Sequence, residues 1–413
     1  MAQVTVSNQE YTLTLRALNG MAGAASALGL GLGDLDPDRL IQAACKAERH
    51  DALGDPSFRE GLERLVTNID HSNFSHFARI LTRQSCIHAL RNRLRCEAYI
   101  QKHPEVLDIP IERPLFVLGF PRTGTTLLQN LVGQASDRRA LRFWELNSPT
   151  PVHEDAARDE RQRVATAERV LRAAYFVAPE MGAVHEVRAD TVEECWPLFF
   201  NNFSVMNYDL QSGLTDYGAW LLSQDMTGPY GWFKRQLQVM QHHQPGKRLI
   251  LKCPEHLWFL DALFDVFPDA CVVWTHRDPY ASVASYCSLI SIAWRMLYGR
   301  FDPHVIGQHI EDRFLGGVTR AMDARTRLNR EESFFDVSFP ELVSQPKDVV
   351  HAIYNHFDLP TDPQFDGAMT DWLASKRADK RGAHKYSAER YGLDKDALHA
   401  RYSDYIERFN IKL

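Results

Sequence analysis

The sequence predicts an α/β protein in which a parallel sheet is flanked by helices, with a helical N-terminal region and a helical, aromatic-rich insertion. Three observations predict this fold. A buried apolar run at 115–118 passes through a glycine-containing turn into a helix that begins at Thr125. After residue 246, short apolar runs alternate with helical patterns, which is the order of a parallel sheet. Before residue 110, apolar residues recur three or four positions apart, as in helices.

Composition excludes several classes of function. The chain has 413 residues, of which 45% are hydrophobic and 24% charged, so it can bury a large core. The net charge of −6 argues against a nucleic-acid partner or an anionic membrane, because both need a basic face. No segment has the apolar length of a membrane span, and the N-terminus lacks the pattern of a signal peptide. We therefore expect a cytoplasmic protein.

The cysteines indicate neither disulfides nor a metal site. Seven cysteines are scattered along the chain, and no two form a C-x-x-C pair. An odd, dispersed set does not fit a disulfide framework or a zinc site. We expect reduced, mostly packed thiols and no bound metal.

Residues 1–110 are predicted to form the helical N-terminal region. Asp36-Pro37 and Asp55-Pro56 are helix start signals, and a long helical pattern runs from about 77 to 103. Pro104 and Pro110 mark the end of this region. We expect these helices to cover the sheet; closing a substrate site or forming an oligomer are further possibilities that the sequence does not select.

Residues 111–413 are predicted to form the α/β domain, with the helical insertion at 150–246. Each aromatic residue of the insertion, taken alone, is best read as core. Taken together, they also suggest an apolar pocket for an acceptor molecule. The aromatic residues of the insertion are Trp196, Phe199, Phe200, Phe203, Tyr208, Tyr217, Trp220, Tyr230, Trp232 and Phe233.

After the insertion, strands and helices alternate. We expect strands at 248–252, 270–275 and 334–339, and helices at 255–267, after Pro279, and at 348–357. The tail, 380–413, begins with a Lys-Arg-Gly turn and ends in a helix. In such a sheet the ligand lies at the carboxyl ends of the strands.

The first strand leads into an anion-binding turn. Backbone N–H groups of Gly119–Gly124 and of the helix that opens at Thr125 converge on one point, where the helix dipole favours negative charge. The spacing is that of the phosphate-binding P-loop, so the sheet is of P-loop type, but Thr125 replaces the lysine that holds a nucleotide triphosphate. The cation of the turn is Arg122, whose planar fork suits a tetrahedral oxyanion. An ordinary strand-turn-helix is the alternative.

A second signal follows the strand at 270–275. A P-loop NTPase would place an acidic magnesium ligand near this strand end. Here the chain continues with His276 and Arg277, and Ser285 lies two turns into the next helix. Alone, Arg277 and Asp278 could be a local ion pair. With the first turn, Arg277 and Ser285 point to a nucleotide that carries phosphate at two ends.

Four motifs in order now give a specific resemblance. GFPRTGTTLL, LKCP, THRDPYASVASY and KRGAH resemble the motifs of sulfotransferases that use 3′-phosphoadenosine 5′-phosphosulfate (PAPS) and leave 3′-phosphoadenosine 5′-phosphate (PAP). The chain is most similar to the bacterial type with Pro-Arg-[Ser/Thr]-Gly-Thr-Thr, which resembles the protein-tyrosine sulfotransferases. The resemblance covers roughly residues 113–390. It implies an enzyme that transfers a sulfuryl group to a hydroxyl group.

The resemblance also implies a set of cofactor-binding residues. Phe339 stands where many relatives have a tyrosine beside the adenine, and Leu127 stands where the cytosolic enzymes have a stacking tryptophan, so the adenine contacts stay open. The 5′-phosphosulfate would be held by Arg122, Thr123, Gly124, Thr125 and Thr126, and the 3′-phosphate by Arg277 and Ser285, with Lys380, Arg381 and Gly382 closing over it.

The chemistry requires cations at the leaving oxygen and a base at the acceptor. Sulfuryl transfer should resemble phosphoryl transfer, in which negative charge collects on the leaving oxygen. We expect Arg122 and Lys252 to meet that charge. Lys252 ends the strand next to the turn and matches a catalytic lysine of the resembled group. Its alternative is a strand-end lysine that extends to solvent.

The base is predicted to be Glu145. The cytosolic enzymes have a histidine two positions after the lysine, but here that position is Pro254. Glu145 lies 23 residues after Arg122, close to the spacing of a glutamate in the tyrosine-sulfating relatives, and Trp144 and Phe143 suggest an apolar surround that would raise a carboxyl pKa. Rival bases are His185, Glu186, Glu193, Glu194 and His256, each of which could instead be solvated or structural.

Two other classes stay as alternatives. A P-loop kinase or NTPase would need a lysine after Gly124 and an acidic metal ligand. A nucleotide-binding module without catalysis would have no use for Lys252 and an acid near the turn. We expect a small hydrophobic acceptor, an alcohol or a phenol, and the patterns specify no oligomeric state.

Overall fold

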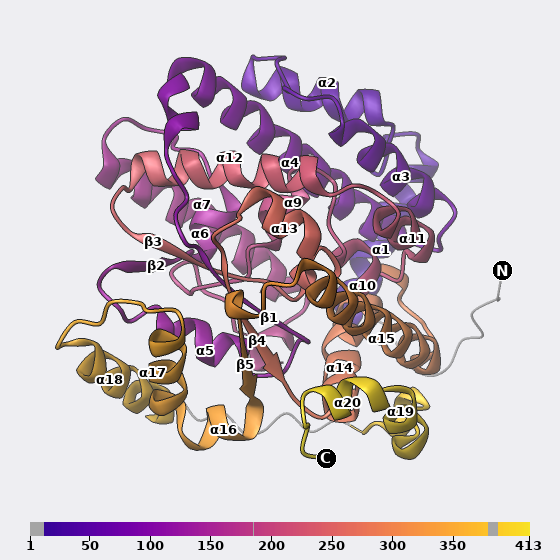
Figure 1. Ribbon diagram of the computed structural model, residues 1–413. Coiled ribbons are helices and arrows are strands. Elements are labelled where there is room, and N and C mark those ends of the chain that lie inside the picture. Colours follow the sequence, from indigo (N-terminus) through magenta and orange to yellow (C-terminus); the bar gives the residue numbers. More distant parts are fainter. Residues whose placement is uncertain (1–11, 185, 379–386) are drawn as a thin grey trace.

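The computed structural model describes residues 12–184, 186–378 and 387–413. Across these residues, five strands form one parallel sheet with helices on both faces (Figure 1). The order is β2-β3-β1-β4-β5, so β1 is central. The predicted α/β fold is confirmed. The strands are β1 Leu115–Gly119, β2 Arg138–Ala140, β3 Arg248–Lys252, β4 Cys271–His276 and β5 Phe334–Ser338.

The apolar runs of the strands result from burial on both faces of the sheet. Successive side chains of a strand point to opposite faces. Phe116 and Leu118 of β1 therefore pack into one core cluster, and Leu115 and Val117 pack into another. Because helices cover both faces, every residue of β1 is buried and the strand reads as a continuous apolar run. β2 was not predicted, since its three residues carry two arginines.

The smaller core cluster lies between the sheet and four helices. Leu128 and Leu131 of the helix after the turn face it, as predicted, and Leu127 is half-buried at its edge. β5 ends one residue before Phe339, which begins a helix that was not predicted. The helices on this face are α5 Thr125–Val132, α16 Phe339–Ser344, α17 Pro346–His356 and α18 Phe365–Ala378.

The larger cluster joins the sheet to the N-terminal helices. Leu40, Leu62 and Leu90 share this cluster with Phe116 of β1, so these helices cover one face of the sheet. The helices expected between Leu35 and His103 are present, and a further helix, α1, precedes them. The N-terminal helices are α1 Leu13–Ala27, α2 Pro37–Glu48, α3 Phe58–Asp70 and α4 His76–Lys102, followed by the 3₁₀ helix η1 Pro104–Asp108.

The insertion is largely helical, as predicted, and most of its aromatic side chains belong to the core. Phe199 stacks on Phe233 with ring centroids 4.6 Å apart. Trp196, Phe200 and Trp220 are only half-buried. Most members of the expected acceptor pocket are therefore core residues. The helix before the insertion is α6 Phe143–Asn147, and the helices of the insertion are α7 Ala156–Val177, α8 Met181–Val184, α9 Trp196–Phe200, α10 Asn207–Leu210, α11 Thr215–Leu222 and α12 Thr227–His243.

The helix expected at 255–267 is broken. Phe259 leaves the helical conformation and places its ring in the core, so a 3₁₀ helix precedes the α-helix. β4 runs one residue further than expected, to His276. The remaining helices are η2 Pro254–Trp258, α13 Leu260–Val266, α14 Pro279–Tyr298, α15 Pro303–Leu328, η3 Glu331–Ser333, η4 Glu389–Tyr391, α19 Lys395–Arg401 and α20 Ser403–Arg408.

Neither disulfides nor membrane spans occur in the described part of the chain. All seven cysteines are free thiols, and six of them are buried. None of the described helices is both long enough and apolar enough to traverse a bilayer.

A close contact at Gly61 gives a prediction about the packing of the N-terminal helices against the insertion. A Cβ on Gly61 of α3 would lie 2.4 Å from the carbonyl oxygen of Phe203. Gly61→Ala should therefore lower the free energy of unfolding by about 2 kcal/mol, the usual cost of overpacking. Urea denaturation measures it. Gly316→Ala, in open space on α15, is the control and should gain about 0.5–1 kcal/mol; equal behaviour of the two variants would contradict the contact.

Candidate active site

The turn after β1 is held closed by buried hydroxyl groups. Gly119 and Gly124 have φ angles of +138° and +89°, and Arg122 has +73°, so all three adopt left-handed backbone. A Cβ on Gly119 would lie 2.4 Å from Oγ1 of Thr275, so this position requires glycine. The Thr123 hydroxyl donates to the Phe120 carbonyl at 2.7 Å and lies 2.6 Å from Oγ1 of Thr275. The side chain of Thr123 thus stabilises the turn.

The N-terminus of α5 faces the same turn. Among the described residues, no side chain caps this helix, whose N-cap is Gly124. Its first backbone N–H groups have no partner within the helix, and the helix dipole makes this end positive. Thr126 is exposed here and Thr125 is buried. The turn and α5 together have the backbone geometry that the sequence predicts for an anion cradle.

Lys252 lies beside the first turn of α5. Parallel pairing of β1 with β3 sets Lys252 opposite Val117. The lysine is 1% exposed, its Nζ lies 2.9 Å from Oε1 of Glu194, and it donates to Oγ1 of Thr126 at 3.4 Å. The N–H of Cys195 donates to the Lys252 carbonyl at 2.9 Å, which fixes Glu194 next to the lysine.

The second sequence signal meets the first at Arg122. Nε of Arg122 donates to Oγ of Ser285 at 3.1 Å, and Nη1 of Arg277 donates to the Arg122 carbonyl at 2.7 Å. The guanidinium of Arg277 lies over the Phe339 ring, 4.4 Å from its centroid. A Cβ on Gly124 would be 3.1 Å from that ring, so Phe339 also borders the turn. Lys380, Arg381 and Gly382 lie outside the described residues.

The carboxylate of Glu145 caps a helix and pairs with an arginine. One oxygen accepts from the backbone N–H of Arg142 at 2.8 Å and closes the first turn of α6, and the other pairs with Arg139. The predicted apolar environment of the Glu145 carboxylate is therefore wrong, because the guanidinium of Arg139 lies next to it. The Trp144 ring packs with Ala167 and Ala189 instead.

The other candidate bases differ in their surroundings. His256 is fully buried, with Nδ1 2.7 Å from the Tyr230 hydroxyl and Nε2 3.4 Å from Sγ of Cys195. Glu186 is exposed. Glu193 accepts from the hydroxyl of Thr191 at 3.3 Å, and His185 lies outside the described residues. Of the candidate carboxylates in the described chain, Glu194 is the one in contact with Lys252.

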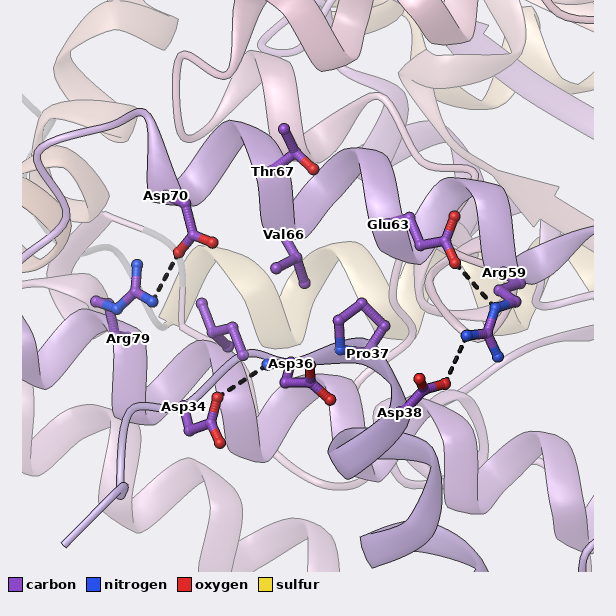
Figure 2. Close-up of a pocket in the computed structure, with 11 residues that line it drawn as sticks. Asp34, Asp36, Pro37, Asp38, Arg59, Glu63, Val66, Thr67, Asp70 and Arg79 are labelled. Carbon is purple, nitrogen blue, oxygen red and sulfur yellow. Dashed lines mark hydrogen bonds and ion pairs between the residues drawn. The ribbon is translucent and has the colours of Figure 1, made fainter. Parts of the chain in front are cut away.

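A pocket that is separate from the turn and the strand ends lies at the N-terminal helices (Figure 2). It has a volume of about 580 Å³, is bordered by α3 and the start of α2, and is rich in carboxylates. Figure 2 shows Arg59 bridging Asp38 and Glu63, and Arg79 pairing with Asp70. The two arginines pair with three of the five carboxylates of the lining. None of the lining residues belongs to the turn or to the ends of the strands.

Comparison with known proteins identifies the family. A model of the sulfotransferase family matches residues 114–363, more than half of the chain. The chain belongs to the sulfotransferase family. The match contains the anion cradle, Lys252, Arg277 and Ser285.

Solved structures of two bacterial sulfotransferases resemble this one along most of their length. Sulfotransferase STF9 from Mycobacterium avium is 32% identical, with a TM-score of 0.81, over 91% of this chain and 97% of that one. Sulfotransferase STF1 from Mycobacterium tuberculosis H37Rv is 29% identical, with a TM-score of 0.79, over 89% and 98%.

A curated relative matches more locally. The omega-hydroxy-beta-dihydromenaquinone-9 sulfotransferase Stf3 of Mycobacterium bovis is 22% identical over 153 residues, 36% of this chain. The match spans 38% of the length of that relative.

The sequence did not reveal the buried polar residues next to Lys252, which include Cys195 and Glu255. Burial alone would raise the pKa of the Cys195 thiol, but a hydrogen bond with Cys253 and the nearby His256 lower this pKa below its usual range. Burial raises the pKa of Glu255, whose carboxylate accepts from the N–H of Met206. The Glu-Glu-Cys and Lys-Cys-Pro-Glu segments carried this signal, but only the fold places them together.

The cap at Glu145 gives a stability prediction for this sulfotransferase. Glu145→Gln should lower the free energy of unfolding by about 3 kcal/mol, because it removes the charge that pairs with the largely buried Arg139. Chemical denaturation at neutral pH measures this loss. Glu186→Gln, at an exposed position, is the control and should change stability little; an unchanged stability of Glu145→Gln would rule out the structural role.

Proposed function

We propose that this sulfotransferase transfers a sulfuryl group from PAPS to a hydroxyl of a small hydrophobic acceptor. The observation that carries the proposal is the convergence at Arg122, where Ser285 bonds the side chain and Arg277 bonds the carbonyl. Two anion-binding groups at the carboxyl ends of adjacent strands fit a nucleotide with phosphate at both its 5′ and 3′ ends. When bound, PAPS supplies an activated sulfuryl group on its 5′-phosphate.

The residues fit such a donor. The uncapped N-terminus of α5 and the left-handed turn offer backbone N–H groups to the 5′ end, together with Arg122, Thr126 and Lys252. Arg277 and Ser285 would hold the 3′-phosphate. We assign Phe339 and Leu127 to the adenine, and Lys380, Arg381 and Gly382 to the cover of the 3′-phosphate, on the resemblance of the motifs.

Lys252 and Arg122 are assigned to charge stabilisation. Lys252 holds its ammonium at the first turn of α5, where the negative charge of a leaving phosphate oxygen would collect. Its position at the end of β3 fixes the backbone, and its burial keeps bulk water from screening the charge.

We assign the base to Glu194 in preference to Glu145. A base must lie within hydrogen-bond reach of the acceptor proton. Glu194 lies 2.9 Å from Lys252 and its side chain is 27% exposed, so an acceptor can approach it. The side chain of Glu145 is 4% exposed, and both its oxygens are engaged. Glu145 stays as the alternative base.

A hydrophobic acceptor is favoured by the aromatic residues that come after Glu194. Helix α9 begins two residues later with Trp196, and the half-buried rings of Trp196 and Phe200 lie 6.1 Å apart. The similarity to a sulfotransferase of a menaquinone derivative supports an apolar acceptor with a hydroxyl group.

The function is tested by ligand identity and turnover. Mass spectrometry of nucleotides that copurify should find PAP, and a screen of alcohols, phenols and amines with labelled PAPS should give labelled products. ADP as the bound nucleotide, with no sulfuryl transfer, would favour the kinase alternative. Bound PAP without turnover of any acceptor would favour a nucleotide-binding module.

The 3′-phosphate site gives a ligand-specific prediction. Arg277→Ala and Ser285→Ala should weaken binding of PAP, by roughly tenfold or more for the arginine, because a charged hydrogen bond is lost. Binding of adenosine 5′-phosphate, which lacks the 3′-phosphate, should change little. Titration calorimetry with both nucleotides decides it, with the surface variant Arg39→Ala as control. Equal losses for both nucleotides would contradict the assignment.

The base is tested by a matched pair of variants. Glu194→Gln should lower kcat about a hundredfold with an aliphatic alcohol and much less with an acidic phenol, which already presents its oxyanion. Glu145→Gln should lose stability but keep kcat. Steady-state rates across phenols of graded acidity measure both. The reverse pattern would return the base role to Glu145.

A further inference from the structure

We propose that the C-terminal segment Asn410–Lys412 forms a wall of the nucleotide site, with Lys412 adding a second cation beside Arg277. The inference rests on the proposed function, because the ligand is the purine nucleotide of that site. It concerns residues outside the four motifs and outside the match to the family model.

A cavity at the carboxyl ends of β4 and β5 carries the inference. Its volume is about 250 Å³, and three segments line it. One follows β4 and includes Arg277 and Asp278, one is Ser338–Pro340, and the third is the chain end from Phe409 to Lys412. Figure 1 shows the C-terminus between α16 and α20, at the edge of the sheet where these strands end.

The chain end is positioned by a helix cap. Asn410 has a φ angle of +46°, and its N–H donates to the Glu407 carbonyl at 3.3 Å. The N–H of Ile411 donates to the Ile406 carbonyl at 3.0 Å. These two bonds and the left-handed residue define a Schellman motif, for which asparagine is the common substitute for glycine. The cap sets the direction in which Ile411 and Lys412 leave α20.

Helix α20 is in turn fixed to β4. The Tyr405 hydroxyl lies 3.0 Å from Nδ1 of His276, and the Phe409 ring stacks on the His276 ring with centroids 4.0 Å apart. Nε2 of His276 lies 2.9 Å from Oδ1 of Asp336 on β5. The chain end is thus held against the residue that precedes Arg277.

The lining suits one heterocycle with a phosphate beside it. The cavity is smaller than usual pockets for whole ligands, which have about 300–1,000 Å³, so it fits part of a nucleotide. Phe339 and Ile411 supply apolar surface, and Asn410 supplies an amide that can bond a purine edge. Arg277 and Lys412 supply positive charge.

The carboxylate that lines the cavity is already engaged. Oδ1 of Asp278 accepts from the N–H of Tyr280 at 2.9 Å and lies 2.9 Å from Nε2 of His399. Asp278 caps α14 through this oxygen. Its charge is partly satisfied there, which leaves the two cations for a phosphate.

The test compares two substitutions of one lysine. Lys412→Ala should weaken binding of PAP roughly five- to tenfold in calorimetry at low salt, and Lys412→Arg should bind as the wild type does. Binding of adenosine 5′-phosphate should change less than twofold in Lys412→Ala. Lys395→Ala, on α19 and away from the cavity lining, is the control. Unchanged PAP binding in Lys412→Ala would overturn the role of the cation.

A truncation tests the wall itself. Removing residues 411–413 should weaken both nucleotides, because it takes away the apolar surface of Ile411 as well as the charge. If the wild-type protein and the truncated protein bind PAP equally well, this inference is overturned and the proposed function is not. Wild-type protein that binds neither nucleotide overturns the proposed function and the inference with it.

Discussion

The parallel pairing of β1 with β3 and β4 is the constraint on which the whole site depends. It sets Val117 opposite Lys252 and Gly119 opposite Thr275, so three strand ends meet at one edge of the sheet. Each strand contributes one kind of group: β1 the turn, β3 the lysine and β4 Arg277. Because a strand spaces its residues by about 3.3 Å, a shift of register by one residue would move Lys252 away from α5 and turn it to the other face.

Close packing at Gly119 stabilises the register between β1 and β4. The backbone there passes so near Thr275 that a methyl group would collide with its hydroxyl, and the same hydroxyl contacts Thr123. The geometry of the turn is therefore fixed by buried side chains before any ligand arrives. Such preorganisation matters for an anion site, since N–H groups that are already aimed at the ligand need little reorganisation when charge develops.

The sequence predicts the backbone geometry of the turn and the helix start well, because its determinants are local. Gly119, Gly124 and the helix start at Thr125 lie within seven residues, and Arg277 follows its own strand directly. The carboxylate next to Lys252 was harder to predict, because the bond from Cys195 to Lys252 joins segments 57 residues apart and has no local pattern. The spacing of Glu145 from Arg122 says nothing of the groups that its carboxylate contacts. A glutamate at the third residue of α6 is also the pattern of a capping box, and here the cap uses one oxygen of Glu145 while Arg139 pairs with the other.

Under the proposed function, the ion pair of Lys252 and Glu194 would link binding of the donor to the availability of the base. A lysine that is almost fully buried needs a partner for its charge, and here Glu194 provides it at 2.9 Å. Anionic oxygens in the cradle would lie near the same ammonium and would compete with the carboxylate for it. Glu194 has partial exposure into which it can turn, whereas Lys252 is fixed by β3. Release of the carboxylate would then follow occupation of the cradle, and the base would turn towards the acceptor only when there is a group to transfer.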